Sequence, residues 1–256
     1  MTLPQHRPQP LAIFCLALTL LGCSTAPDAA PQTSSAAAPS SAQQPPAPAA
    51  NSGPILAIGD SILKWNAEVD SAIPDVLGQT LKRPVTNSAV SGAHLSLPEP
   101  NADQPTYDIR QQYQPQDWDW VVMNGGANDL AGNCACETCS PLIDDMIGED
   151  GLSGEIPDFA RQVTATGSKL MYVGYYAMPS DARFGFDQCN DELDAHNTRL
   201  AKMAAALPNI WFVSAAAVVS PQDLNAYDAD RVHPSAAGSQ QIGQHIAEAI
   251  AAAEAE

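Results

Sequence analysis

The sequence predicts an α/β fold, in which a parallel sheet has helices packed on both of its faces. The first observation is that short apolar runs without hydrophobic alternation recur along the chain, at Ile55–Ile58, Trp120–Met123, Leu170–Val173 and Ile210–Val213. Such runs, rich in β-branched and aromatic residues, suit strands that are buried on both faces of a parallel sheet. The second is that helix-compatible stretches lie between these runs, so right-handed crossovers place helices on both faces.

The remaining elements follow the same alternation. A weaker fifth strand is predicted at Pro84–Asn87. The predicted helices are Glu68–Leu81, about Asp144–Thr166, Asp191–Leu207, and Ser235 to the C-terminus. In the last of them, Ile242, Ile246 and Ile250 are spaced four apart, which places them on one face of the helix.

The charge of the chain excludes one class of partner. The chain has 256 residues, with 11 Lys and Arg against 29 Asp and Glu, so its formal net charge is −18. A nucleic-acid binder needs a basic face for the phosphates, and we therefore expect no nucleic-acid partner. No apolar run reaches the roughly 18 residues that a membrane-spanning helix needs, which excludes a multi-pass membrane protein. We expect a monomer.

The N-terminal residues have the features of an export signal. A weakly basic start is followed by an apolar stretch, Leu11–Leu21, which has the length of the central region of a secretory signal. The tetrapeptide Leu-Leu-Gly-Cys that ends at Cys23 resembles the bacterial lipoprotein signal. This resemblance implies that residues 1–22 are removed and that acyl chains on Cys23 hold the protein on a membrane. Ser24 is compatible with outer-membrane sorting, so the expected location is the cell envelope, at the outer membrane or its periplasmic face. The alternative is an ordinary signal peptide with an incidental cysteine.

Residues 23–52 differ in composition from the rest of the chain. Ala, Pro, Ser and Gln dominate them, and large apolar residues are missing, so they cannot bury enough surface to offset the entropy of ordering. We expect a disordered linker that spaces the following domain from the membrane. Residues 53–256 then have the length of one well-cored domain.

The first motif with chemical potential is Gly59-Asp60-Ser61, directly after the strand Ile55–Ile58. Ligands of open parallel sheets bind outside the carboxyl ends of the strands, so a serine at this junction presents its hydroxyl where a substrate can sit. The alternative is a turn that ends the strand, with serine as a helix N-cap.

The second motif, Asp230-Arg231-Val232-His233, precedes the last helix. A serine nucleophile needs a neutral imidazole as general base, and the imidazole needs a carboxylate that fixes its tautomer. His233 and Asp230 can supply these two groups from one short loop. Asp228 could equally be the carboxylate partner, and a lone Asp-x-x-His is otherwise a common surface turn.

Two further loops follow predicted strands. Asn124–Asp129 contains two adjacent glycines, which let the backbone approach a ligand, and Asn128 has an amide that can donate to a developing oxyanion. The loop Asn87–Gly92 ends at a glycine whose backbone N–H could be another donor. The alternative for the first loop is a simple glycine-rich turn.

Taken together, these four pieces resemble the SGNH hydrolases, the GDSL-type esterases and lipases. The resemblance spans Ile55 to about Ile246, and it implies a flavodoxin-like three-layer α/β/α sandwich with about five parallel strands. One departure is Ala89, where relatives often have glycine, and this puts the shape of that loop in question.

The resemblance also implies roles for individual residues. Ser61 would be the nucleophile, with His233 and Asp230 as its supporting pair. The oxyanion hole would consist of the Ser61 backbone N–H, Gly92 and Asn128. No cofactor and no metal are expected.

The implied reaction is the hydrolysis of a carboxylic ester through an acyl-enzyme on Ser61. The substrate would be a small-molecule or glycan ester, such as an O-acetyl group, or a lysophospholipid or thioester. Two alternatives keep the same fold: an acyltransferase that uses the same residues, and a non-catalytic ligand-binding lipoprotein.

Four of the six cysteines follow the linker: Cys134, Cys136, Cys139 and Cys189. In an exported protein we expect two disulfides, and the sequence leaves all three pairings open. An all-thiolate zinc site is the alternative. Any scheme that uses all four cysteines joins the loop after Asn128 to the segment after the fourth predicted strand.

Two histidines and an aromatic group complete the candidates. We interpret His94 as a histidine at the rim of the site rather than a second base, and we expect His196 to face solvent from its helix. The aromatic residues are expected to pack in the core and at the ends of the sheet, although the tyrosines could line an acyl or sugar subsite. These aromatic residues are Trp118, Trp120, Tyr172, Tyr175 and Tyr176.

Overall fold

A computed structural model describes residues 53–95 and 104–256 of the chain. The signal peptide expected at residues 1–22, the lipid site at Cys23 and the linker up to residue 52 lie outside the described residues. Within the described ranges, no helix combines the length and the apolar character needed to cross a membrane.

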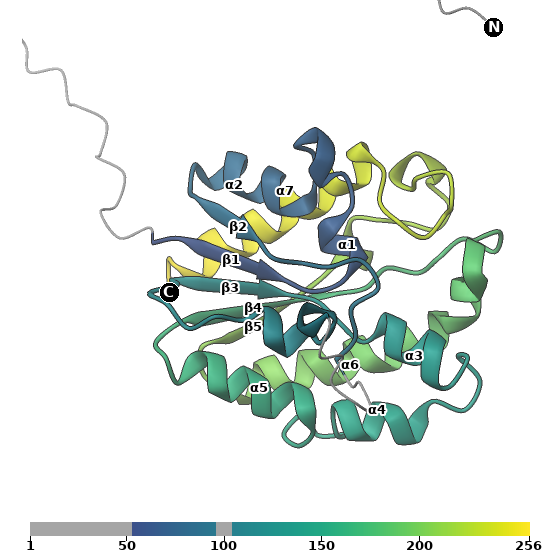
Figure 1. Cartoon of the computed structure of the whole chain (residues 1–256), viewed down its shortest axis with the longest axis horizontal. Coiled ribbons are helices and arrows are strands. Elements are labelled where there is room, and N and C mark those ends of the chain that lie inside the picture. The colour runs from purple at the N-terminus through teal and green to yellow at the C-terminus, as the bar shows by residue number, and fades with distance from the viewer. Residues whose placement is uncertain (1–52, 96–103) are drawn as a thin grey trace, which may run out of the picture. The chain divides into compact units, whose positions relative to one another are not determined.

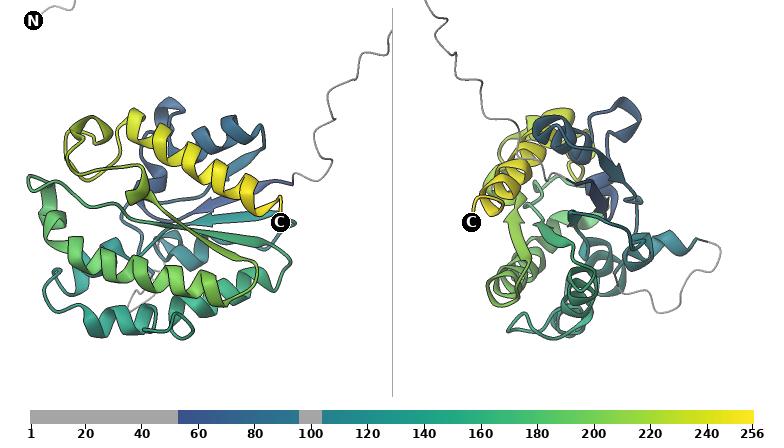
Figure 2. Two further views of the ribbon diagram at one scale, coloured as in Figure 1. Left: turned by 180° about the vertical axis from the view of Figure 1, so that it is seen from behind. Right: turned by 90° about the vertical axis from the view of Figure 1, so that its left-hand side faces the viewer.

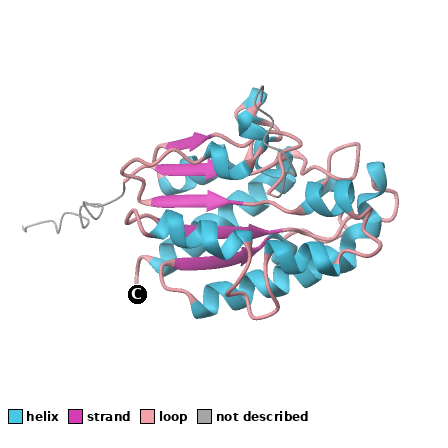
Figure 3. Cartoon of the chain, turned by 60° about the horizontal axis from the view of Figure 1, so that its bottom comes forward, coloured by secondary structure: helices cyan, strands magenta, loops and turns pink. Residues whose placement is uncertain are grey.

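The centre of the described part is a parallel sheet of five strands in the order β2-β1-β3-β4-β5. The strands are β1 Ile55–Ile58, β2 Val85–Asn87, β3 Trp120–Met123, β4 Lys169–Gly174 and β5 Ile210–Ser214. In the register of the sheet, Ile55 pairs with Val85 on one side and with Trp120 on the other. All strands run in the same direction (Figure 3). All five predicted strands are therefore confirmed.

Helices cover both faces of this sheet. The helices are α1 Ser61–Lys64, α2 Ile73–Leu81, α3 Ala127–Asn133, α4 Ser140–Met146, α5 Glu155–Thr164, α6 Asn190–Ala206 and α7 Ala236–Ala253. On one face α2 packs against α7, while α5 and α6 lie on the other face (Figures 1 and 2). This confirms the three-layer α/β/α sandwich.

Two predicted helices have different bounds in the structure. The helix expected from Glu68 begins only at Ile73, because Pro74 in its first turn has no N–H to donate to a preceding turn. The helix expected over residues 144–166 is divided into α4 and α5. Gly151 and Gly154 lie in the interval with φ of +76° and +107°, and this backbone conformation ends one helix before the next begins.

The buried face of α7 explains why this long helix stays on the sheet. Ile242, Ile246 and Ile250 are all completely buried, which confirms the face predicted from their spacing. Burying such a side chain contributes roughly 1.5–3 kcal/mol. Gly243 lies against α2, where an added Cβ would come within 2.6 Å of the Cβ of Val76. The glycine therefore lets the two helices approach closely.

The topology of the sheet indicates where a site can form. Strand β1 lies between β2 and β3, so the chain leaves β1 toward one edge and returns on its other side. In open α/β sheets, ligands bind at the carboxyl ends of the strands at such a switch point. The loops that follow β1, β2 and β3 all meet at this end.

Candidate active site

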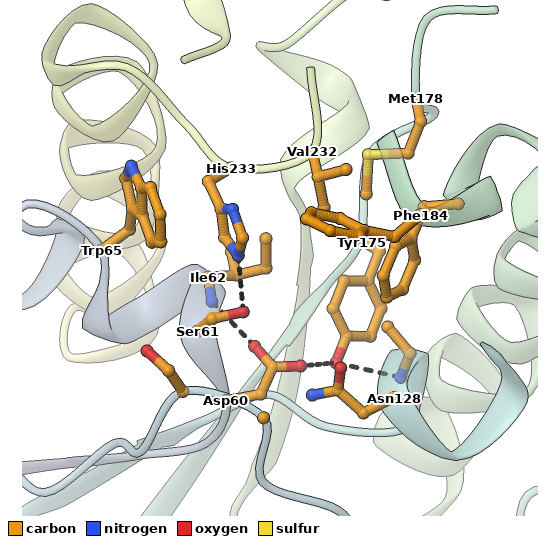
Figure 4. A pocket seen from close by; sticks show the side chains of 14 residues that line it. Asp60, Ser61, Ile62, Trp65, Asn128, Tyr175, Met178, Phe184, Val232 and His233 are labelled. Carbon is orange, nitrogen blue, oxygen red and sulfur yellow. Dashed lines mark hydrogen bonds between the residues drawn. The ribbon is translucent and has the colours of Figure 1, made fainter. Parts of the chain in front are cut away.

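Three side chains predicted from two distant motifs meet at the carboxyl end of β1. Figure 4 shows two of them, Ser61 and His233, facing each other. Ser61 Oγ lies 2.8 Å from His233 Nε2, and His233 Nδ1 lies 2.6 Å from Asp230 Oδ2. A carboxylate can only accept, so Nδ1 carries the imidazole hydrogen and Nε2 is free to accept from the serine hydroxyl. The arrangement is that of a nucleophile, a general base and an orienting carboxylate.

Local structure explains how Ser61 is presented. It is the first residue of α1, and the Asp60 side chain caps this helix by accepting from the Ile62 N–H at 2.9 Å. Gly59, which ends the strand, lies against Asn124, and an added Cβ would come within 1.8 Å of the Asn124 Oδ1. Only glycine fits this turn.

A buried hydrogen-bond network holds the turn formed by Gly59 and Asp60 in place. The Asp60 carboxylate accepts from the Tyr175 hydroxyl at 2.5 Å and from the Asn124 amide at 2.7 Å. Burial raises the pKa of Asp60, and the hydrogen bond from Tyr175 is the largest influence in the opposite direction. Gln112 bonds to both the N–H and the carbonyl of Gly59, at 2.7 and 3.0 Å. Gln112 and Tyr175 had no sequence signal for this role, because they lie 53 and 115 residues from the groups they hold.

The carboxylate partner of His233 is Asp230 and not Asp228. The other oxygen of Asp230 accepts from the backbone N–H groups of Val232 and His233, at 2.9 and 3.0 Å. Burial acts to raise the pKa of Asp230, but its hydrogen bonds to the His233 side chain and to these two N–H groups together hold that pKa below its ordinary value. Asp228 instead accepts from the indole of Trp65 at 2.7 Å.

Trp65 covers one face of the His233 ring, and sequence reasoning did not assign it this role. The two rings are stacked with centroids 3.8 Å apart and an interplanar angle of 6°. The hydrogen bond to Asp228 holds the indole in this orientation. An indole face attracts a cation, so the stack favours the imidazolium that forms when His233 accepts a proton.

We expect Trp65→Phe to lower kcat by about three- to thirtyfold, because phenylalanine retains a weaker face and loses the bond to Asp228. The measurement is the kinetics of p-nitrophenyl butyrate hydrolysis, with kcat and KM determined separately. A fall in kcat/KM caused entirely by a higher KM would contradict this role, because Trp65 would then serve only to bind substrate.

The two predicted oxyanion donors line the same cavity as Ser61. Gly92 has a φ of +79°, which glycine adopts without strain. Asn128 lies in the first turn of α3, and its side-chain NH₂ donates to the Ala93 carbonyl at 2.9 Å. That bond uses one of the two amide hydrogens and leaves the other for a ligand. Ala89, the departure from the family pattern, is buried without a positive φ, so its Cβ is accommodated.

The expectation that His196 faces solvent is wrong. Its side chain is completely buried beside the rings of Tyr172 and Tyr175, behind Gly126 of the loop that follows β3. Burial lowers the pKa of His196 from 6.5 to about 4. The unfolded chain therefore binds more protons than the native state between these two values, and stability falls as the pH decreases from about 6.5 to about 4.

We expect His196→Leu to remove this component of the acid sensitivity. Between pH 7 and pH 4 the wild-type protein should lose about 3 kcal/mol more unfolding free energy than the variant. Urea unfolding at both pH values measures the difference. If the unfolding free energies of the two proteins differ by the same amount at both pH values, His196 does not titrate in this way.

The remaining candidates occupy simpler positions. His94 does not line the cavity of Ser61, and its Nδ1 lies 3.7 Å from the buried carboxylate of Asp129. Tyr172, Tyr175 and Tyr176 are buried as predicted, and Tyr175 also lines the cavity.

The four cysteines form two disulfides, Cys134–Cys139 and Cys136–Cys189. The structure thereby selects one of the three open pairings, and it leaves no thiolate for the alternative zinc site. Cys136–Cys189 joins the loop between α3 and α4 to the segment Arg183–Cys189, which precedes α6.

Comparison with known proteins identifies one matching family model and solved structures of the same fold. Residues 57–241 match the model of the GDSL-like Lipase/Acylhydrolase family. A carbohydrate acetylesterase family member from Sinorhizobium meliloti is 15% identical, with a TM-score of 0.60 over 78% of this chain and 97% of its own. The M. smegmatis aryl esterase is 18% identical, with a TM-score of 0.57 over 78% of this chain and 99% of its own. These two likenesses show a shared fold. None of the curated proteins compared with the chain matches it.

Proposed function

The chain belongs to the GDSL-like lipase/acylhydrolase family of SGNH-type serine ester hydrolases, and on that premise we propose that it cleaves carboxylic esters through an acyl-enzyme on Ser61. The observation that carries the proposal is the unbroken line of hydrogen bonds from Ser61 through His233 to Asp230. Each group is in the state that its role requires: a hydroxyl that donates, an imidazole nitrogen that accepts, and a carboxylate whose pKa is lowered.

The reaction begins when His233 Nε2 takes the proton of Ser61 as Oγ bonds to the ester carbonyl carbon. The carbonyl electron pair moves to its oxygen, which becomes the oxyanion. When the intermediate collapses, the alkoxide leaves and takes the proton from His233. Water then attacks the acyl-enzyme by the same two steps, which releases the carboxylic acid and restores the Ser61 hydroxyl.

The oxyanion receives hydrogen bonds from the Ser61 and Gly92 backbone N–H groups and from the Asn128 amide. We expect Asn128→Ala to lower kcat by about a hundred- to a thousandfold with little change in KM, because this donor is most effective when the negative charge develops. Steady-state kinetics with p-nitrophenyl butyrate measure the effect. An unchanged kcat would remove Asn128 from the oxyanion hole.

The acyl-enzyme itself can be tested by mass spectrometry of peptides from the digested protein. After acid quenching in the steady state with p-nitrophenyl butyrate, a butyryl group is expected on the peptide that contains Ser61 and not on the same peptide from Ser61→Ala. A wild-type protein that turns over the ester without this adduct would favour general-base attack by water. Added alcohols that divert most of the product into new esters would instead favour an acyltransferase.

We also propose that Cys23 is lipidated and that the enzyme is anchored at the bacterial cell envelope as a monomer. The Leu-Leu-Gly-Cys sequence, the linker that follows it and the use of disulfides, which persist in oxidising compartments, support this location. Fractionation of cells that express Cys23→Ala is the test. A variant that stays in the membrane fraction would contradict the lipid anchor.

A further inference from the structure

The cavity beside Ser61 has an apolar side that the reaction mechanism does not use. Its volume is about 230 Å³, and among the described residues that line it there is neither lysine nor arginine. Away from the reacting groups, the apolar residues of its wall are Ile62, Met178, Phe184, Phe186 and Val232, while Asp60, Trp65, Ser91, Ala127 and Tyr175 complete the lining.

Phe184 is the most unusual residue of this wall. It is 76% exposed, and its φ of +64° is a conformation that bulky residues rarely adopt. An exposed aromatic ring and a strained backbone both cost free energy, and such strain collects at ligand-binding sites. A ligand in the cavity would cover the ring and offset part of this cost.

The segment that carries Phe184 is held at both ends. The Arg183 N–H donates to the backbone carbonyl of Asp230 at 2.9 Å, and Cys189 is bonded to Cys136. The ring is therefore kept at a fixed distance from the residue that orients the general base.

The opposite side of the reacting pair differs from this wall because it carries charged groups. Trp65 and Phe184 lie on opposite sides of His233 (Figure 4). Behind Trp65 is a second hollow of about 420 Å³, where the apolar residues Trp65, Ala67 and Val69 are mixed with the charged and polar residues Lys64, Asn66, Glu68, Ser91 and Asp228. An apolar chain would desolvate these polar groups without satisfying them, so this side suits the alcohol portion of an ester.

We propose that the apolar cavity receives the acyl group of the substrate, and that this group is a chain of about six carbons or a ring of similar size rather than acetyl. The proposal rests on the proposed esterase function. A cavity of about 150 Å³ with apolar walls holds a benzene molecule, so the present volume exceeds what an acetyl group can fill. The substrate class is an ester of a medium-length apolar acid with a polar alcohol.

Two isomeric esters test whether the cavity receives the acyl group or the alcohol group of the substrate. Ethyl hexanoate and hexyl acetate have the same atoms and differ in which side of the carbonyl carries the six-carbon chain. With hydrolysis followed in a pH-stat, we expect kcat/KM to be at least tenfold higher for ethyl hexanoate, because each buried methylene contributes a factor of about four. Ethyl acetate is the reference for catalysis without a chain on either side.

Substitutions of Phe184 connect this preference to the cavity. Phe184→Asn removes the ring, and asparagine tolerates the left-handed backbone at this position. We expect this variant to reduce the ratio of kcat/KM for ethyl hexanoate to kcat/KM for hexyl acetate to about three or less. Phe184→Leu keeps an apolar side chain and should retain most of the ratio. Leu152→Ala is the matched control, since Leu152 is an exposed apolar residue outside the cavity and its removal should leave the ratio unchanged.

The outcomes distinguish this inference from the function on which it rests. A preference for hexyl acetate, or equal rates for both isomers beside active cleavage of ethyl acetate, would overturn the assignment of the cavity and leave the esterase intact. A wild-type ratio that Phe184→Asn does not change would also overturn it. If the folded protein cleaves none of the three esters, the proposed function fails and the inference fails with it.

Discussion

Replacing Ser61 with alanine is expected to lower kcat on p-nitrophenyl butyrate by on the order of 10⁶-fold. Without the hydroxyl there is no nucleophile for the acyl-enzyme, and His233 has no proton to accept from the protein. The remaining activity would come from the oxyanion donors and from binding, which still accelerate direct attack by water. KM should change little, because the side chain makes few contacts besides its bond to His233.

The control for this experiment is Ser91→Ala. Ser91 lines the same cavity, so the substitution removes a second hydroxyl from the same surroundings. We expect kcat to stay within about threefold of wild type, since no step of the reaction uses this group. Equal losses in the two variants would show that Ser61 is not the nucleophile. Circular dichroism of both proteins verifies that the fold is retained.

Asp230→Asn is expected to lower kcat by about 10⁴-fold. The asparagine oxygen can still accept from the backbone N–H groups of Val232 and His233, so the loop keeps its shape. Its amide group then faces His233 Nδ1 and donates to it, which moves the imidazole hydrogen to Nε2. His233 can no longer accept the proton of Ser61 in this tautomer.

Asp228→Asn is the matched test of the neighbouring carboxylate. Asp228 accepts from Trp65 and does not contact the imidazole nitrogens, so we expect a loss of kcat of tenfold or less. Both variants are compared with wild type in the same p-nitrophenyl butyrate assay. If Asp228→Asn is as damaging as Asp230→Asn, the two carboxylates act together and the assignment of a single partner is wrong.

Much of the fold could be predicted from the sequence, because the buried strands are defined locally. Strands such as Ile55–Ile58 and Trp120–Met123 are apolar at every position, which is the pattern of strands buried on both faces of a sheet. The bounds of the helices are harder to predict from the sequence, because they depend on the conformation of single residues. Pro74 delays the start of α2, and the glycines between α4 and α5 interrupt a stretch that otherwise suits one helix.

The site was predictable where the chemistry is contained in short motifs. Ser61, Asp230 and His233 each follow from a few adjacent residues, and the structure brings them together as expected. Trp65 and Tyr175 could not be assigned their contacts, because these form only when segments far apart in the chain meet. The positions of these two side chains relative to their partners are set by the folded sheet and not by neighbouring residues in the sequence.

His196 is a different case, since the sequence did contain the signal. Along α6 the buried side chains are Leu193, His196, Leu200 and Met203. Their spacing of three and four residues is that of one face of a helix. A histidine in such a row is predicted to lie in the core, because its position on the buried face of the helix indicates burial more strongly than its polarity indicates exposure.

The disulfide pattern has a consequence for how the protein must be produced. Cys134, Cys136 and Cys139 compete for one another in the unfolded chain, while Cys189 is 53 residues from its partner. Short loops close faster than long ones, so an early oxidation joins two of the three neighbours. Only the Cys134–Cys139 ring leaves Cys136 free for Cys189. Disulfides between the other neighbouring pairs are non-native, and they block the native pairing until a thiolate attacks and opens them. Refolding in a mixture of oxidised and reduced glutathione should therefore give more native enzyme than air oxidation alone.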